Sequence, residues 1–150
     1  MTPTPVCFGA TGDSFGTFTT PTSGDVITFK LIYQSGYVQC YPGYRSHWGC
    51  RLLPPDHQMG THITDSQKNR LLPKEEFLKE PSSGNCLFRI FYRLPGLNPD
   101  SPELLFDNFT TRLHVSAGEQ FQIWFAEDLT KCLEAGNEGQ TCAEVYGLFV

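Results

Sequence analysis

Apolar and polar residues alternate in several short stretches of the chain, and this alternation constrains the fold more than any other feature. A period of two places one set of side chains on each face of a β-strand. Turn-forming pairs such as Ser35-Gly36 and Pro95-Gly96 follow the alternating stretches. The alternation recurs in five segments, at residues 25–33, 86–93, 112–115, 121–125 and 144–149.

These segments predict an all-β protein with little helix. Only residues 73–79 have features of a helix, and Pro81 limits that helix to about two turns. Short strands separated by Gly and Pro turns are typical of a barrel or a sandwich. We expect an antiparallel, jelly-roll-like β-sandwich, and 150 residues are enough for a single domain, 1–150, with its own core.

Charge and hydropathy exclude two kinds of partner. The net charge is −5, and residues 101–150 carry eight acidic and two basic residues. No basic stripe is present to displace counterions from phosphates, so nucleic acid is not expected as a partner. No apolar run approaches the ~18 residues of a transmembrane helix, and the first residues are neither basic nor apolar, so we expect a soluble, processed chain without membrane insertion.

Six cysteines are present, and none has the spacing of a zinc site or a C-x-x-C pair. This pattern favours disulfide bonds in an oxidising, extracellular compartment over buried thiols in the cytosol. Cys40–Cys50 and Cys132–Cys142 would each close a short loop, which leaves Cys7–Cys86 as a long-range bridge. Six cysteines allow 15 pairings, so the sequence leaves the connectivity open. The triplet Asn108-Phe-Thr110 is an N-glycosylation acceptor and agrees with secretion.

An acidic segment between the last two predicted strands is a candidate cation site. Carboxylate and amide oxygens are the ligands that Ca²⁺ prefers, although the spacing here is not that of an EF-hand. The alternative is a solvated acidic hairpin that protects a sheet edge from aggregation. The candidate ligands are Glu127, Asp128, Asn137 and Glu138.

The ring closed by Cys40 and Cys50 is a candidate sugar site. A sugar stacks its C–H face on an aromatic ring while its hydroxyls bind fixed polar groups. The same aromatic residues could instead pack inward as a plug, with Trp48 in the core and the two tyrosines exposed. The candidate ligand-binding residues are Tyr41, Tyr44, Arg45, His47 and Trp48.

Catalytic motifs are absent from the sequence. It contains no G-x-S-x-G elbow, no H-E-x-x-H motif and no glycine-rich phosphate loop. Neighbouring pairs such as Ser46-His47 and Asp56-His57 seldom satisfy the geometry of a catalytic triad. We therefore do not expect an enzyme.

The chain resembles a secreted module that is common in proteins of corals and sea anemones, and the likeness spans nearly its whole length. The resemblance implies an extracellular β-sandwich more than a defined activity, and Cys132 is additional to the usual pattern, which counts against Cys132–Cys142. In size the chain is also similar to the cnidarins, antiviral lectin-like proteins of soft corals. The motifs that carry the resemblance are Cys7-Phe-Gly, Phe15-Gly-Thr-Phe18, His47-Trp-Gly-Cys50, Gln122-Ile-Trp-Phe-Ala-Glu-Asp-Leu129 and Thr141-Cys-Ala-Glu-Val-Tyr146.

These observations predict a secreted, lectin-like protein that recognises glycans or glycoproteins, with a role in antiviral or other defence implied by the resemblance. The alternative is a structural or adhesive extracellular-matrix module with an acidic Ca²⁺-binding loop and no sugar specificity. An unpaired edge strand would allow a homodimer, which strengthens weak binding through avidity.

Overall fold

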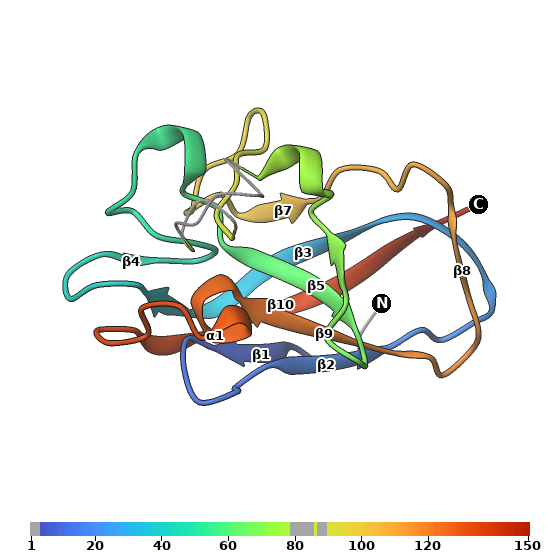
Figure 1. The fold of residues 1–150 in the computed structure, drawn as a ribbon. Helices are drawn as coiled ribbons and strands as arrows, with labels where there is room; N and C mark the ends of the chain where they lie inside the picture. Colours follow the sequence, from blue (N-terminus) through green and yellow to red (C-terminus); the bar gives the residue numbers. More distant parts are fainter. Residues whose placement is uncertain (1–3, 79–85, 87–89) are drawn as a thin grey trace.

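Two antiparallel β-sheets face each other in the computed structural model, which describes residues 4–78, 86 and 90–150 (Figure 1). The first sheet has the order β1-β10-β3-β4, and β7 and β8 also pair with β3. Its strands are β1 (Val6–Gly9), β3 (Gly24–Gln39), β4 (Arg45–Ser46), β7 (Glu103–Leu105), β8 (Leu113–Val115) and β10 (Glu138–Phe149). The second sheet has the order β2-β9-β5-β6. Its strands are β2 (Gly16–Thr19), β5 (Thr61–Asp65), β6 (Arg70–Leu72) and β9 (Gln120–Phe125). The predicted all-β sandwich is confirmed.

The helical elements bounded within the described residues are short. Two are 3₁₀ turns, η1 (Pro55–His57) and η2 (Glu75–Phe77), and the third is the helix α1 (Ala126–Thr130). The helix predicted at 73–79 is therefore only a single turn within the described residues. None of the described helices is long and apolar enough to cross a membrane.

Two sequence predictions about strands are wrong. Strand β3 runs through Ser35-Gly36, which we expected to be a turn, because β10 pairs with it along nearly its full length and Gly36 (φ +82°) lies beside a register shift. The strand expected at 86–93 is not formed between Ile90 and Arg93. There Tyr92 makes isolated bridges to Met59 and Leu78, and its hydroxyl donates to the carbonyl of Thr61. Residues 87–89 lie outside the described part of the chain.

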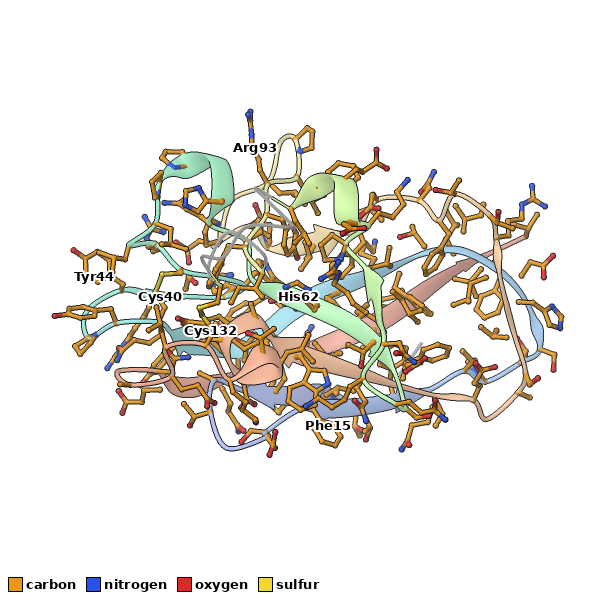
Figure 2. All side chains as sticks on the ribbon, viewed as in Figure 1. Phe15, Cys40, Tyr44, His62, Arg93 and Cys132 are labelled. Atoms are coloured by element: carbon orange, nitrogen blue, oxygen red, sulfur yellow. A yellow bond between two sulfur atoms is a disulfide. The ribbon has the colours of Figure 1, made fainter. Side chains whose placement is uncertain are left out.

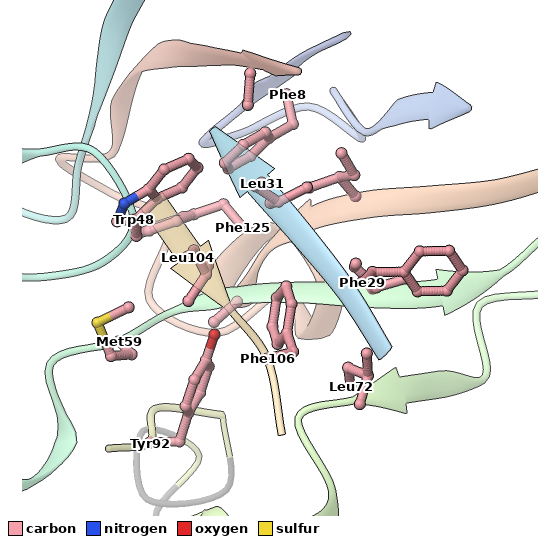
Figure 3. Packing of buried hydrophobic residues seen from close by; sticks show 14 of the residues in the cluster. Phe8, Phe29, Leu31, Trp48, Met59, Leu72, Tyr92, Leu104, Phe106 and Phe125 are labelled. Atoms are coloured by element: carbon pink, nitrogen blue, oxygen red, sulfur yellow. The ribbon is translucent and has the colours of Figure 1, made fainter. Parts of the chain in front are cut away.

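The core lies between the two sheets and is rich in aromatic rings (Figure 3). Phe18 and Phe29 meet edge to face at 5.3 Å between ring centroids, and Phe121 lies 5.5 Å from Phe29. The alternation in β9 is as predicted, because Phe121, Ile123 and Phe125 belong to this core. Each buried ring of this size contributes roughly 1.5–3 kcal/mol through removal of apolar surface from water.

Three disulfide bonds connect the six cysteines. The Cys40–Cys50 bridge is present as predicted. The other two predicted pairings are wrong, because the bonds are Cys7–Cys142 and Cys86–Cys132. The register of the β1–β10 pair explains the Cys7–Cys142 bond. The two cysteines lie directly opposite each other in this pair, with their Cα atoms 4.0 Å apart.

Candidate functional site

The structure brings the two predicted loops together in one pocket. The pocket has a volume of 150 Å³ and receives residues from the 40–53 segment and from the 127–135 segment. The amide of Gln39 links the segments by donating to the carbonyl of Gly136 at 3.4 Å and to the Glu138 carboxylate at 3.3 Å. We call this site the loop pocket; its lining residues are Cys40, Tyr41, Cys50, Leu52, Leu53, Glu127, Leu133 and Ala135.

Two of the five predicted sugar-binding residues present exposed aromatic rings. Tyr41 is 54% exposed and Tyr44 is 38% exposed, and their ring centroids lie 6.2 Å apart. Arg45 is exposed beside them, with its guanidinium 4.2 Å from the ring centroid of Tyr37. Figure 2 shows Tyr44 at the far end of the loop that follows β3. These three residues form an exposed surface of two phenol rings and a guanidinium group, which we call the tyrosine surface.

The other two predicted residues serve the fold. Trp48 is completely buried, and its indole N–H donates to the carbonyl of Ser101 at 2.7 Å. The His47 ring stacks on Tyr33 with 3.5 Å between centroids. The prediction that Trp48 contacts ligand is therefore wrong, and the inward-packing alternative is correct for it, because its only polar atom finds a buried acceptor.

The four predicted Ca²⁺ ligands do not form a metal site. The completely buried carboxylate of Asp128 accepts hydrogen bonds from the backbone N–H groups of Asp13 and Ser14, both at 2.9 Å. Glu138 instead binds Gln39. Within the described residues, no group of three or more His, Cys, Asp or Glu side chains is placed to hold a metal ion. Asp128 and Glu138 therefore each have a structural partner away from the other predicted ligands.

Glu127 differs from its neighbour Asp128 because part of its carboxyl group has no partner. The residue is only 3% exposed, and its Oε1 atom makes no hydrogen bond within the described part of the chain. Burial raises the pKa of Glu127 to about 8, with an opposing contribution from the Asn137 amide and a further increase from the charge of Glu134. Glu127 is therefore largely protonated at neutral pH.

A second candidate site lies on the outer face of the second sheet and was not predicted. It is an open cavity of 450 Å³ centred on two rings, Phe15 and Trp124, whose centroids are 4.8 Å apart with a 30° angle between planes. Phe15 is 37% exposed, whereas Trp124 is buried beneath it. We call this site the aromatic groove; its lining residues are Asp13, Phe15, Ser66, Gln67, Lys68, Gln122 and Trp124.

Hydrogen bonds within the fold fix the floor of the aromatic groove. The Trp124 indole N–H donates to the Gln122 side-chain oxygen at 2.9 Å, and the Gln122 amide donates to the Ser66 carbonyl at 3.4 Å. The ammonium of Lys68 lies 4.6 Å from the Trp124 ring centroid. The polar groups of Gln122 and Trp124 are therefore occupied, while Gln67, Lys68 and Asp13 are exposed at the rim.

Two carboxylates hold the turns that form the rim. Asp128 binds the backbone of residues 13 and 14, as described above, and Lys131 makes an ion pair with the Asp13 side chain. This hydrogen bond from Lys131 lowers the pKa of Asp13. On the other side, the Asp65 carboxylate accepts from the backbone N–H groups of Gln67 and Asn69 at 2.8 and 3.0 Å. Both turns are thus fixed before any ligand arrives.

One signal in the sequence points to the aromatic groove. Trp124 lies on the polar face in the alternation of β9. A large aromatic ring on that face is either covered by other side chains or exposed as an apolar patch, and such patches often mark binding sites. The cover of Trp124 comes from Phe15 and from two lysines, Lys68 and Lys131, whose ammonium groups lie within 6 Å of its ring centroid. These residues are distant in sequence, so the alternation alone could not identify them.

Comparison with known proteins gives one informative result. No protein-family model matches the chain, and no curated protein matches it. Among solved structures, the chain is similar to AJLec from the sea anemone Anthopleura japonica, with 29% identity and a TM-score of 0.86. The likeness covers 97% of this chain and 93% of AJLec. The protein therefore has a lectin-like β-sandwich fold that contains disulfide bonds.

Proposed function

We propose that the protein binds glycans and that the aromatic groove is its sugar site. The observation that carries this proposal is an exposed aromatic ring, Phe15, surrounded by a carboxylate, an amide and an ammonium group. A sugar needs this combination, because its C–H face stacks on a ring while its hydroxyls require polar partners. Asp13, Gln67 and Lys68 supply those partners at the rim.

The rigidity of the groove supports this assignment. Asp128 and Asp65 already fix the backbone of both rim turns, so binding orders few additional groups. A preorganised site loses less conformational entropy on binding than a mobile loop does. The volume of 450 Å³ is in the range of small-ligand sites, whereas the loop pocket is much smaller.

The similarity to AJLec, a lectin, supports the same class of function for this chain. Three disulfide bonds fit an oxidising, extracellular compartment, where glycans and glycoproteins are the accessible partners. Defence against viruses or microbes would be one use of such recognition. A homodimer formed through a sheet edge would strengthen weak sugar binding through avidity.

The surface formed by Tyr41, Tyr44 and Arg45 is the alternative location for the sugar. Its two rings are more exposed than Phe15, but the pocket that Tyr41 lines has a volume of only 150 Å³, against 450 Å³ for the aromatic groove. Because Tyr41 and Phe15 are both exposed aromatic residues, their variants serve as matched controls for each other.

The experiment that tests the proposal is a glycan array with the unmodified protein, F15A and a Y41A/Y44A double variant, each with and without Ca²⁺. We expect selective binding that F15A weakens at least tenfold and that Y41A/Y44A retains. The opposite pattern would move the sugar site to the tyrosine surface. Absence of binding to every glycan would contradict the proposed function and favour the structural or adhesive alternative.

A further inference from the structure

The loop pocket combines a buried acidic group with apolar walls, and the proposed glycan site does not use it. Glu127 contributes the acidic group, and the Cys40–Cys50 disulfide, Tyr41 and two leucines on the same segment contribute the walls. Leu133 lies across from them and is 63% exposed. A ligand that covered these side chains would remove apolar surface from water.

The unpaired Glu127 oxygen indicates what kind of ligand fits. A buried carboxyl oxygen without a hydrogen-bond donor costs free energy, and native proteins seldom contain one. Two such carboxyl oxygens, Glu127 Oε1 and Glu134 Oε1, and one amide oxygen, Asn137 Oδ1, occur in a single stretch. In its ionised form Glu127 therefore lacks a donor, and a charged donor forms the stronger bond with a carboxylate.

The surrounding charges favour a cation at Glu127. Lys131, the basic residue that directly follows α1, interacts with two other acidic residues. Its ammonium forms an ion pair with Asp13 and lies 3.6 Å from the Asp128 carboxylate. Among the described residues, the influences on Glu127 are burial, the Asn137 amide and the negative charge of Glu134. No described cation neutralises this carboxyl group, which agrees with the elevation of its pKa.

The walls favour an organic cation over a metal ion. Ca²⁺ requires six to eight oxygen ligands, and no group of three or more acidic, His or Cys side chains in the described residues is arranged for a metal. Leucine side chains and a disulfide supply no such ligands, but they match the methylene groups of an alkyl chain. A cavity of 150 Å³ has room for a short chain of this kind and not for an oligosaccharide.

From these observations we infer that the loop pocket binds a primary alkylammonium group, with the ammonium at the Glu127 carboxylate and the alkyl chain between Tyr41, Leu53 and Leu133. A lysine side chain of a partner protein and an amino sugar both present a primary ammonium. The apolar walls favour the lysine side chain, because its ammonium is carried on a flexible chain of methylene groups without hydroxyls.

The test is a titration followed by NMR and calorimetry at pH 8.5 with n-butylammonium chloride and Nα-acetyl-lysine methylamide, with n-butanol as the uncharged control. Glucosamine is compared with the lysine derivative at pH 7, where both amines are largely charged. We expect saturable binding of the first two probes, with dissociation constants near 1 mM, roughly −4 kcal/mol. Glucosamine should bind at least tenfold more weakly, and n-butanol should show no saturation. Tighter binding of glucosamine than of the lysine derivative would overturn the assignment to lysine.

Two isosteric variants show whether Glu127 is responsible. E127Q should weaken n-butylammonium at least tenfold, whereas E103Q, which changes an exposed acid on β7 that does not line the pocket, should bind as the unmodified protein does. Equal affinity in E127Q, or equal affinity for n-butanol, would overturn the inference, as would displacement of n-butylammonium by stoichiometric Ca²⁺. Because F15A leaves this pocket intact, failure here and failure of the glycan proposal are separately visible.

The affinity should also rise between pH 6 and pH 8.5. An ammonium binds best when Glu127 is ionised, and the alkylammonium itself, like a lysine, stays charged until about pH 10. The other titratable or charged groups close to Glu127 are Glu134, which acts on it directly, and Asp128, Lys131 and Tyr41 nearby. E127Q should abolish this pH dependence; if the dependence persists in E127Q, another group binds the ammonium.

Discussion

The aromatic groove and the loop pocket each involve one of two adjacent acidic residues of α1, and the two carboxyl groups differ in their partners. Asp128 has its carboxylate oxygens filled by backbone N–H groups of the groove turn, whereas Glu127 has an oxygen without a partner in the described residues. The contrast shows that a run of acidic residues says little about function until the partner of each oxygen is known. It also separates a residue that positions a site from one that is available to a ligand.

Removing the Asp128 carboxylate should have the largest effect on stability and on glycan binding. D128A leaves two backbone N–H groups of the 13–14 turn and the Lys131 ammonium without their buried acceptor. We expect a loss of about 3–5 kcal/mol in the free energy of unfolding, measured by urea denaturation, together with loss of glycan binding. E103Q, which changes an exposed acid on β7, is the control and should change the stability by less than about 0.5 kcal/mol. A fully stable D128A would mean that the groove turn is held by other contacts.

Neutralising Glu127 should change how stability depends on pH. The folded pKa of about 8 lies above the ordinary value of 4.5, so the folded state holds the proton more tightly and stability falls as pH rises between these values. E127Q lacks this loss, and above pH 8 it should be more stable than the unmodified protein by at most roughly 5 kcal/mol. Below pH 4.5 the two proteins should have nearly equal melting temperatures. Parallel curves of melting temperature against pH would contradict the burial of an ionisable Glu127.

Removing the Cys40–Cys50 bridge should affect one site and spare the other. The bridge stabilises the protein by restricting the unfolded chain, and the effect grows with the length of the closed loop. For the short loop between Cys40 and Cys50, a C40A/C50A variant should lose about 3 kcal/mol in the free energy of unfolding. Ammonium binding should be lost with the pocket wall, whereas glycan binding should persist at a temperature where the variant is folded. Loss of both activities in a folded variant would show that the two sites are not independent.

The smallest expected effect concerns Lys68. Its ammonium lies 4.6 Å from the Trp124 ring centroid and is exposed at the groove rim. K68A should leave the free energy of unfolding within about 1 kcal/mol of the original value, since exposed cation–π contacts are weak. It should weaken glycan binding several-fold in isothermal titration, while n-butylammonium affinity stays the same. An unchanged glycan affinity would remove Lys68 from the sugar site.

The fold could be predicted from the sequence because alternation is a local property. The segments 25–33, 112–115, 121–125 and 144–149 all lie within strands, or within one residue of a strand, in the structure. The disulfide pairing could not be predicted in the same way. Cys7 and Cys142 meet only because β1 and β10 pair in one register, which depends on contacts between the two ends of the chain.

The candidate sites were predictable only in part, for a related reason. The exposure of Tyr41 and Tyr44 follows from their loop, but the burial of Trp48 depends on the distant Ser101 carbonyl. The aromatic groove is assembled from residues near 13–15, 66–68 and 122–124, and no single one of these segments has the pattern of a binding motif. Sequence position therefore identified the loops but not which side chains remain free for a ligand.

The most direct test of glycan binding in the aromatic groove uses the two tryptophans of the chain as paired reporters. The Trp124 indole lies in the groove and the Trp48 indole lies in the core, so a ¹H–¹⁵N spectrum gives one indole N–H signal for each. On titration with the glycan that binds most strongly on the array, we predict a saturable shift of the Trp124 signal and a stationary Trp48 signal. A stationary Trp124 signal, accompanied by shifts at Tyr41 and Tyr44, would contradict the account.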